Sequence, residues 1–292
     1  MNKVLIVADS TCDLSPEYVK EHDVRIIPLR VSFPGENIEY LDGVDIKSLE
    51  IYKKVEELGV IPKTSALNAN DFIEYMEPLI EKGYDIVYTG IGSGLSSSYN
   101  TVSLAAQELP EGRVFVVDSM NLSTGIGLIV NKMVEFRDAG MSAKEIAEKV
   151  QPLVYNTSAK FTIDRMDYLY MGGRCSGLAK HFFNTFKVHP ICKVINGKLT
   201  VARVELGAYR KGINAQIREL KKDLEAGNVD TSCVFITDSQ CMDGEDDYAY
   251  EEVAKLIDPS CIHRTHAGCI VSSHCGPKTI GILYLLKGKP AK

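Results

Sequence analysis

The sequence predicts an α/β protein with two parts: an N-terminal three-layer α/β domain built on a parallel sheet, and a C-terminal α+β domain with a largely antiparallel sheet. Three observations predict this class. Short apolar runs alternate with amphipathic helical patterns through the first half, as in βα units. The second half contains Asn196-Gly197, a strong signal for a two-residue β-hairpin turn. The chain has 292 residues, enough for about two domains.

The first half begins with a strand and a helix. Val4 to Val7 form an apolar run that ends in Asp9-Ser10-Thr11, which is typical of a buried parallel strand entering a polar loop. Ser15-Pro16 supplies a helix N-cap and a proline at the first helical position. The same rules predict strands at 24–33, 86–90 and 114–117, and helices at 45–58, 69–82, 101–109, 122–139 and 143–155.

The pattern changes near residue 160, and the boundary is placed there, giving domains 1–160 and 161–292. The Asn196-Gly197 turn joins two extended segments, 188–195 and 198–205. A long amphipathic helix follows at 209–226. Further strands are expected at 160–163, 232–237, 261–265 and 279–286.

Composition excludes several classes of function. There are 39 acidic and 33 basic residues, a net charge of −6, and the basic residues form no stripe that could track nucleic acid. The longest apolar run, 280–286, is too short to cross a bilayer, and the N-terminus lacks a signal-peptide core. The eight cysteines are scattered without a CxxC motif. We therefore expect a cytoplasmic protein with reduced thiols.

Polar segments follow three of the predicted parallel strands. They are Asp9-Ser10-Thr11, the Ser/Gly-rich stretch 92–98 and Asp118-Ser119. Open parallel sheets bind ligands at the carboxyl ends of their strands. The sequence therefore predicts a ligand site formed by these three segments.

The stretch 92–98 is the most informative of them. It precedes a predicted helix, whose N-terminal N–H groups, together with the hydroxyls of Ser93, Ser96, Ser97 and Ser98, would bind a phosphate or a carboxylate. The alternative is that one serine caps the helix and the glycines only form the turn. The stretch matches neither a Walker motif, a dinucleotide fingerprint nor a serine-hydrolase elbow.

Three other segments have a functional and an ordinary interpretation. Thr64-Ser65 could donate hydrogen bonds to a ligand or cap the helix that begins near Ala69. Gly172-Gly173-Arg174 could bind an anion or be a turn with an exposed arginine. Residues 261–275 are rich in Cys and His, but their spacing fits zinc poorly. Within them, the ring of His274 could face a cleft.

Seven segments, taken in order and spacing, resemble the DegV family: 9–14, 27–29, 64–65, 92–99, 118–119, 172–176 and 274–277. The resemblance spans essentially the whole chain. It implies a protein that binds one long-chain fatty acid between its domains, with the acyl chain in an apolar tunnel and the carboxyl group at a polar mouth. Relatives include the binding subunits of the bacterial fatty acid kinase, which present the carboxyl group to a separate kinase for acyl-phosphate formation.

The resemblance also implies roles for residues of this chain. Donors to the carboxyl group would be Thr64, Ser65, Ser93, Ser96, Ser97 and His274. Arg174, Arg210 and His274 would meet a phosphoryl group or the partner kinase. The protein would be a lipid carrier and not itself an enzyme, with no cofactor and no metal, and lipid would be accepted or delivered transiently at a membrane surface.

The sequence departs from the usual family pattern at the mouth. Gly92 stands where a second serine is usual, Ser97-Ser98 where Gly-Thr is usual, Leu67-Asn68 where Pro-Ser is usual, and Lys278 where glycine is usual. The fatty acid, the kinase partner and the oligomeric state therefore stay open. Two alternatives also stay open: a stand-alone phosphoryl-transfer or hydrolytic enzyme using the Ser-rich stretch with His274 as acid/base, and a zinc module at 261–275.

Overall fold

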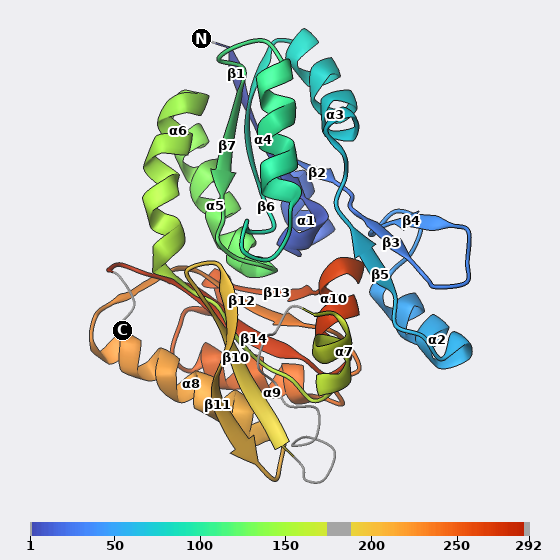
Figure 1. The fold of residues 1–292 in the computed structure, drawn as a ribbon. Coiled ribbons are helices and arrows are strands. Elements are labelled where there is room, and N and C mark those ends of the chain that lie inside the picture. The colour runs from blue at the N-terminus through green and yellow to red at the C-terminus, as the bar shows by residue number, and fades with distance from the viewer. Residues whose placement is uncertain (1, 174–187, 289–292) are drawn as a thin grey trace.

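The computed structural model describes residues 2–173 and 188–288. Figure 1 shows two stacked bodies of helices and strands, with the N-terminal part above the C-terminal part, and a small third sheet at the side. The mixed α/β class and the change from a parallel to a mostly antiparallel sheet are confirmed.

The N-terminal sheet has four parallel strands in the order β2-β1-β6-β7. They are β1 (Lys3–Asp9), β2 (Val24–Ile27), β6 (Tyr84–Gly90) and β7 (Val114–Asp118). The chain adds β2 on one side of β1 and later returns to add β6 on the other side. This reversal makes the carboxyl ends of β1 and β6 the place where an open α/β sheet forms a ligand crevice.

Helices cover both faces of this sheet and give the predicted three layers. Apolar side chains of α3 (Ala69–Glu81) and α4 (Ser98–Glu108) pack on one face. Those of α5 (Thr124–Asp138) and α6 (Ala143–Val150) pack on the other. The α-helical part of α6 ends before the predicted residue 155, because Pro152 cannot continue the ladder and a 3-10 helix, Gln151–Asn156, follows.

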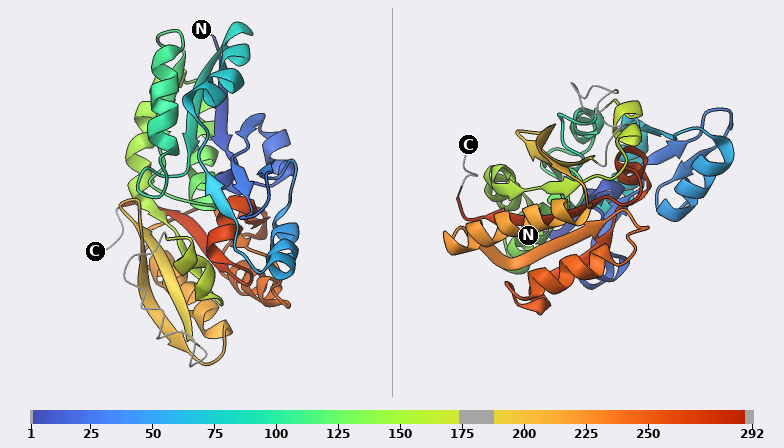
Figure 2. Two further views of the ribbon diagram at one scale, coloured as in Figure 1. Left: turned by 45° about the vertical axis from the view of Figure 1, so that its right-hand side comes forward. Right: turned by 90° about the horizontal axis from the view of Figure 1, so that it is seen from below.

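A separate three-stranded antiparallel sheet was not expected from the sequence. It consists of β3 (Arg30–Ser32), β4 (Glu39–Leu41) and β5 (Lys63–Ser65), and it carries α2 (Ser48–Leu58). The single strand predicted at 24–33 is wrong, since Pro28 offers no N–H to the ladder and separates β2 from β3. Figure 1 and the right-hand view of Figure 2 show this sheet and α2 projecting from the rest of the molecule.

The C-terminal sheet has the order β11-β10-β9-β14-β12-β13, with β8 paired to β14. All its pairs are antiparallel except β12 with β13. The Asn196-Gly197 hairpin is confirmed, with positive φ at both residues. The strands are β8 (Thr157–Ser158), β9 (Lys160–Thr162), β10 (Val188–Ile195), β11 (Lys198–Leu206), β12 (Val229–Asp238), β13 (Ile262–His266) and β14 (Ile280–Leu286).

Two helices, α8 (Arg210–Glu225) and α9 (Glu245–Ala254), cover the outer face of this sheet. Its inner face turns toward α5 of the N-terminal part, where Phe235 and Leu283 join the apolar cluster of that helix. The remaining helices are α1 (Pro16–Glu21), which Ser15 caps as predicted, and the short α7 (Met166–Met171) and α10 (Cys269–Cys275). The division between domains at residues 160 and 161 stays a prediction.

Candidate functional site

The Ser-rich loop, residues 91–98, is held by two carboxylates at the edge of the parallel sheet. Asp9, at the end of β1, accepts a hydrogen bond from the Ile91 N–H at 2.9 Å. Asp118, at the end of β7, accepts one from the Ser93 N–H at 3.0 Å. The predicted meeting of the strand ends is therefore present, but these aspartates orient the loop and do not themselves face the cavity described below.

Serine hydroxyls also shape the start of α4. The Ser96 hydroxyl accepts a hydrogen bond from the Ser98 N–H at 3.2 Å and lies 2.9 Å from the Ser98 hydroxyl. Ser97, which precedes α4, makes no side-chain cap bond. The capping interpretation thus applies to Ser96. Ser96 can still donate a hydrogen bond to a ligand, because a hydroxyl oxygen can accept one bond while its proton is donated elsewhere.

The short helix α10 is fixed at its N-terminus by carboxylates from the N-terminal part of the chain. Asp13 accepts from the Gly268 N–H at 2.8 Å, and Asp42 accepts from the Cys269 N–H at 2.7 Å. These bonds satisfy N–H groups that a helix leaves unpaired. They also set the position of the last turn of α10, which carries His274.

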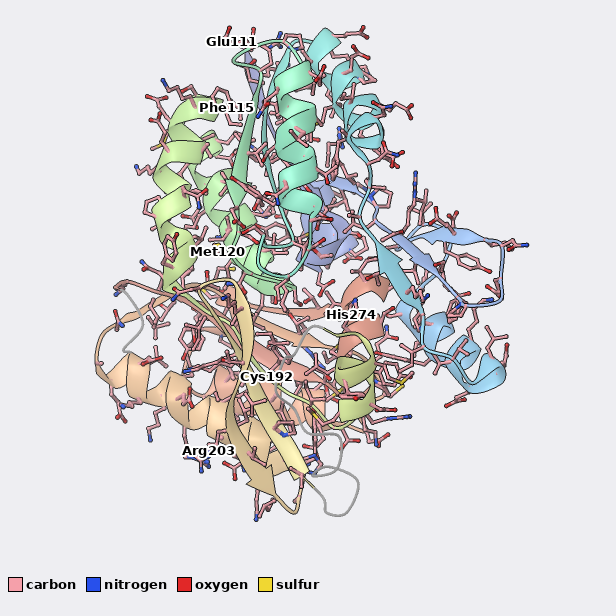
Figure 3. All side chains as sticks on the ribbon, in the orientation of Figure 1. Glu111, Phe115, Met120, Cys192, Arg203 and His274 are labelled. Atoms are coloured by element: carbon pink, nitrogen blue, oxygen red, sulfur yellow. The ribbon has the colours of Figure 1, made fainter. Side chains whose placement is uncertain are left out.

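His274 meets Thr64 of β5 across the junction of the two parts. The His274 Nε2 and the Thr64 Oγ1 are 2.9 Å apart and hydrogen-bonded. Figure 3 labels His274 at the end of α10 that lies beside α7. Two segments that are 210 residues apart in the chain thereby form one polar pair. Thr64 lies on a strand, and the cap of α3 is Asn68, so the capping interpretation of Thr64-Ser65 is wrong.

A cavity of about 250 Å³ lies beside this pair, between the N-terminal and C-terminal parts. Its lining is mainly apolar. Its polar lining includes five residues named from the sequence: Thr64, Ser65, Ser96, Ser97 and His274. The apolar lining is Leu29, Ala66, Ile91, Leu95, Leu122, Phe161, Leu169, Leu199, Ala267, Ile270, Val271 and Leu283.

Some polar lining residues were not found from the sequence. Ser123, Thr237, Asp238 and Thr279 reach the cavity from the starts or ends of helices and strands. Asp238 is buried and accepts hydrogen bonds from the Gln240 N–H and from His266, and the bond to Asp238 raises the pKa of His266. The only sequence signal for Asp238 was its place at the end of a predicted strand.

The structure brings together most, but not all, of the predicted site residues. Five of them, Thr64, Ser65, Ser96, Ser97 and His274, line the same cavity. Ser93 is absent from the lining, and its hydroxyl lies 3.9 Å from the Met120 sulfur. Arg210 pairs with Glu245 at 2.9 Å and stacks on Tyr248. Arg174 lies outside the described residues.

Three of the four departures from the family pattern, at Gly92, Leu67-Asn68 and Lys278, have local explanations. A Cβ at position 92 would lie 2.6 Å from the Asn121 nitrogen, so the Asp118–Asn121 turn leaves room only for glycine. Leu67 is buried in the N-terminal core, and Asn68 caps α3. Lys278 has positive φ and pairs with Asp243.

Apart from His274, the Cys and His side chains of segment 261–275 that are described next take part in packing. His263 packs against Tyr18 and Phe235, and the Cys269 thiol donates to the Ile46 carbonyl. Cys275 lines the cavity, and burial raises its pKa to about 12, which keeps it a thiol. Within the described ranges no three His, Cys, Asp or Glu side chains gather as a metal site, and the three cysteines of this segment, Cys261, Cys269 and Cys275, are in no disulfide.

Comparison with known proteins places this architecture in a family. A family profile described as "Uncharacterised protein, DegV family" matches residues 3–287. A DegV domain-containing protein of Staphylococcus aureus is 32% identical over 294 residues, which cover 98% of this chain and 100% of the relative. The chain belongs to the DegV family.

Solved structures agree. A stearic acid-binding protein from Eubacterium ventriosum is 29% identical, with a TM-score of 0.84, over 98% of this chain and 99% of that one. A DegV family protein from Thermus thermophilus, described for its fatty acid binding, is 27% identical, with a TM-score of 0.83, over 98% and 100%. Among the helices that the structure describes, none is long and apolar enough to cross a membrane.

Proposed function

We propose that this member of the DegV family binds one long-chain fatty acid in the cavity between its two parts. The observation that carries the proposal is a mainly apolar cavity whose lining includes the hydrogen-bonded Thr64–His274 pair. The acyl chain would occupy the apolar body of this cavity, and the carboxyl group would lie at the Thr64–His274 pair, which would form its polar end. The fatty acids bound by the two structural relatives support this proposal.

The apolar body would supply most of the affinity. Burying about fifteen methylenes is worth on the order of 12 kcal/mol at roughly 0.8 kcal/mol each. The loss of translational and rotational freedom and the ordering of the chain offset part of this gain. What remains is enough to hold a fatty acid through purification.

The polar end would make burial of the head group tolerable. A carboxylate removed from water costs several kcal/mol unless it is hydrogen-bonded. The hydroxyls of Thr64, Ser96 and Ser97 and the imidazole of His274, which line the cavity from three separate elements, would donate to the carboxyl group there. Ser65 lines the same cavity. The N-terminus of α4 adds a favourable dipole beside these hydroxyls.

Removing one donor at the polar end is expected to weaken binding without unfolding the protein. Thr64→Val and Ser96→Ala each delete a hydroxyl, which should raise the Kd for palmitate by about 5- to 150-fold, equivalent to roughly 1–3 kcal/mol. Ser93→Ala is the matched control, because Ser93 lies outside the cavity lining, and it should change the Kd less than about twofold. Titration of delipidated protein with palmitate measures all three.

Equal Kd values for the parent, Thr64→Val and Ser96→Ala would show that the carboxyl group binds elsewhere. A loss of affinity in Ser93→Ala as large as in Ser96→Ala would instead support the head-group role that the sequence suggests for Ser93.

We further propose that the protein is a cytoplasmic carrier, not an enzyme, and that it presents the carboxyl group to a separate kinase that forms the acyl phosphate. A transferring phosphoryl group spreads charge over several oxygens and calls for cationic donors. Arg174 follows the glycine pair at the end of α7, and Arg210 begins α8. His274 would serve both the carboxyl and the phosphoryl group.

Arg174→Ala is expected to separate binding from transfer. Palmitate should stay bound, because most of the affinity comes from the apolar cavity, while acyl-phosphate formation by a partner kinase should slow at least tenfold, or about 1.4 kcal/mol. Arg218→Ala, an exposed arginine on α8, is the control. The rate of acyl-phosphate formation is measured with each variant preloaded with palmitate. A rate in Arg174→Ala equal to that of the parent would show that Arg174 does not serve phosphoryl transfer.

A further inference from the structure

The ends of α7 and α10 interlock through a glycine on each. Gly172 follows α7 with φ −69° and ψ −14°, a conformation that alanine adopts freely. A Cβ on Gly172 would nevertheless lie 2.3 Å from the His274 Nδ1 and 3.2 Å from its Cε1. Glycine is therefore required at this position because the His274 imidazole leaves no room for a Cβ, and not because of the backbone conformation.

The contact is reciprocal. Gly276 follows α10, and a Cβ there would lie 2.8 Å from the Tyr168 Cδ2 on α7. The Tyr168 ring is itself buried between Tyr52, with ring centroids 6.2 Å apart, and the Arg165 guanidinium, 5.2 Å from its centroid. Thus the His274 ring of α10 packs against the glycine that follows α7, and the Tyr168 ring of α7 packs against the glycine that follows α10.

The opposite side of the His274 ring is fixed as well. Its Nε2 is hydrogen-bonded to the Thr64 hydroxyl, and α10 is held at its other end by Asp13 and Asp42. The imidazole therefore lies between the Gly172 backbone and β5, with little freedom to turn.

We propose that Gly172 is a positioning residue, through which α7 sets the orientation of the His274 imidazole toward the ligand carboxyl group. The part that concerns the ligand rests on the proposed function, whereas the contact itself does not.

The test is a double-mutant cycle of Gly172→Ala and His274→Ala. Gly288→Ala is the matched glycine control, because its added Cβ would meet no atom closer than 3.4 Å, at the Asn228 Oδ1. Three quantities are measured: the thermal midpoint of lipid-free protein, the ¹⁵N shifts of the histidine rings, and the Kd for palmitate. His274→Ala assigns the His274 ring signals by their loss.

Introduced into the parent protein, Gly172→Ala should shift the His274 ring signals and lower the thermal midpoint of the lipid-free protein. Introduced into the His274→Ala variant, the same substitution should change the Kd and the thermal midpoint much less. The expected rise in Kd is about tenfold in the parent and less than twofold in that background, since residues in contact are not additive. If Gly172→Ala does not fold alone, its rescue by His274→Ala gives the same support.

Equal effects of Gly172→Ala in both backgrounds, unchanged His274 ring signals, or failure of His274→Ala to rescue folding would each overturn the positioning role. If the His274 ring signals shift as expected but the protein binds no palmitate, the contact between Gly172 and His274 is upheld. The same result overturns the proposed function, and with it the role of this contact in orienting His274 toward a carboxyl group. The two failures are therefore distinguishable.

Discussion

Replacing Leu122 by Trp is expected to reduce fatty acid affinity at least about 100-fold, the largest effect on binding that the structure predicts. Leu122 lines the cavity just before α5 and packs against the apolar cluster around Phe161. An indole at this position would fill part of the cavity that we propose the acyl chain occupies. Displacing even four methylenes forfeits on the order of 3 kcal/mol at roughly 0.8 kcal/mol each.

Leu104→Trp is the control for this prediction. Leu104 lies on α4, is 58% exposed and does not line the cavity. Both variants are purified in parallel, and the bound lipid and the Kd for palmitate are measured together with thermal stability. A folded Leu122→Trp protein that bound palmitate as tightly as Leu104→Trp would show that the acyl chain does not lie in this cavity.

Asp13→Ala is expected to cost about 3 kcal/mol of unfolding free energy. The substitution removes hydrogen bonds to the Ser123 hydroxyl, at 2.5 Å, and to the Gly268 N–H, at 2.8 Å, which tie the segment after β1 to the start of α5 and to the start of α10. It also places alanine at φ +50°, where Asp and Asn are better tolerated. Asp13→Asn keeps both bonds, because its amide can donate to the Ser123 oxygen, and should cost less than about 1 kcal/mol.

The two variants should also differ in pH dependence. Burial raises the pKa of Asp13 well above its usual range, so the folded chain holds this proton more tightly than the unfolded chain does. The stability linked to Asp13 is therefore fully present below the ordinary aspartate pKa and is lost as the pH rises through the raised value. Asp13→Asn removes this dependence, and its free energy of unfolding should fall less steeply with pH.

Urea denaturation at several pH values checks both statements. Asp138→Asn, which changes a carboxylate on α5 that is 58% exposed, should keep the parental slope. Burial also raises the pKa values of Asp9 and Asp42, so Asp13→Asn should reduce the slope without abolishing it. A slope identical to that of the parent would mean that Asp13 is ionised in the folded protein at no cost.

Much of the fold could be predicted because local signals and tertiary packing agree. The strand β1, the Ser15-Pro16 helix start and the Asn196-Gly197 hairpin each follow from chemistry within a few neighbouring residues. The side sheet was missed because β3, β4 and β5 have three residues each, too few for a periodic pattern. α10 was missed for a related reason: its seven residues depend on distant carboxylates for their N-terminal hydrogen bonds.

The residues of the candidate site were predicted better than their contacts. Thr64, Ser96 and His274 were named from motifs, but only the folded chain brings Thr64 and His274 within hydrogen-bond distance. From the sequence alone, the hydroxyls of Ser93 and Ser96 are equally good candidates for binding a ligand. In the folded chain Asp118 holds the Ser93 N–H, and Ser96, not Ser93, lines the cavity. Gly172 has no side chain to attract attention, and its importance becomes visible only from what an added Cβ would meet.

Organic extraction of the purified protein, followed by mass spectrometry against its molar concentration, tests the central claim most directly. We expect a long-chain fatty acid in near one-to-one amount, released on denaturation. Recovery of nucleotides alone, or of no lipid under conditions in which a control lipid-binding protein keeps its own, would contradict the claim.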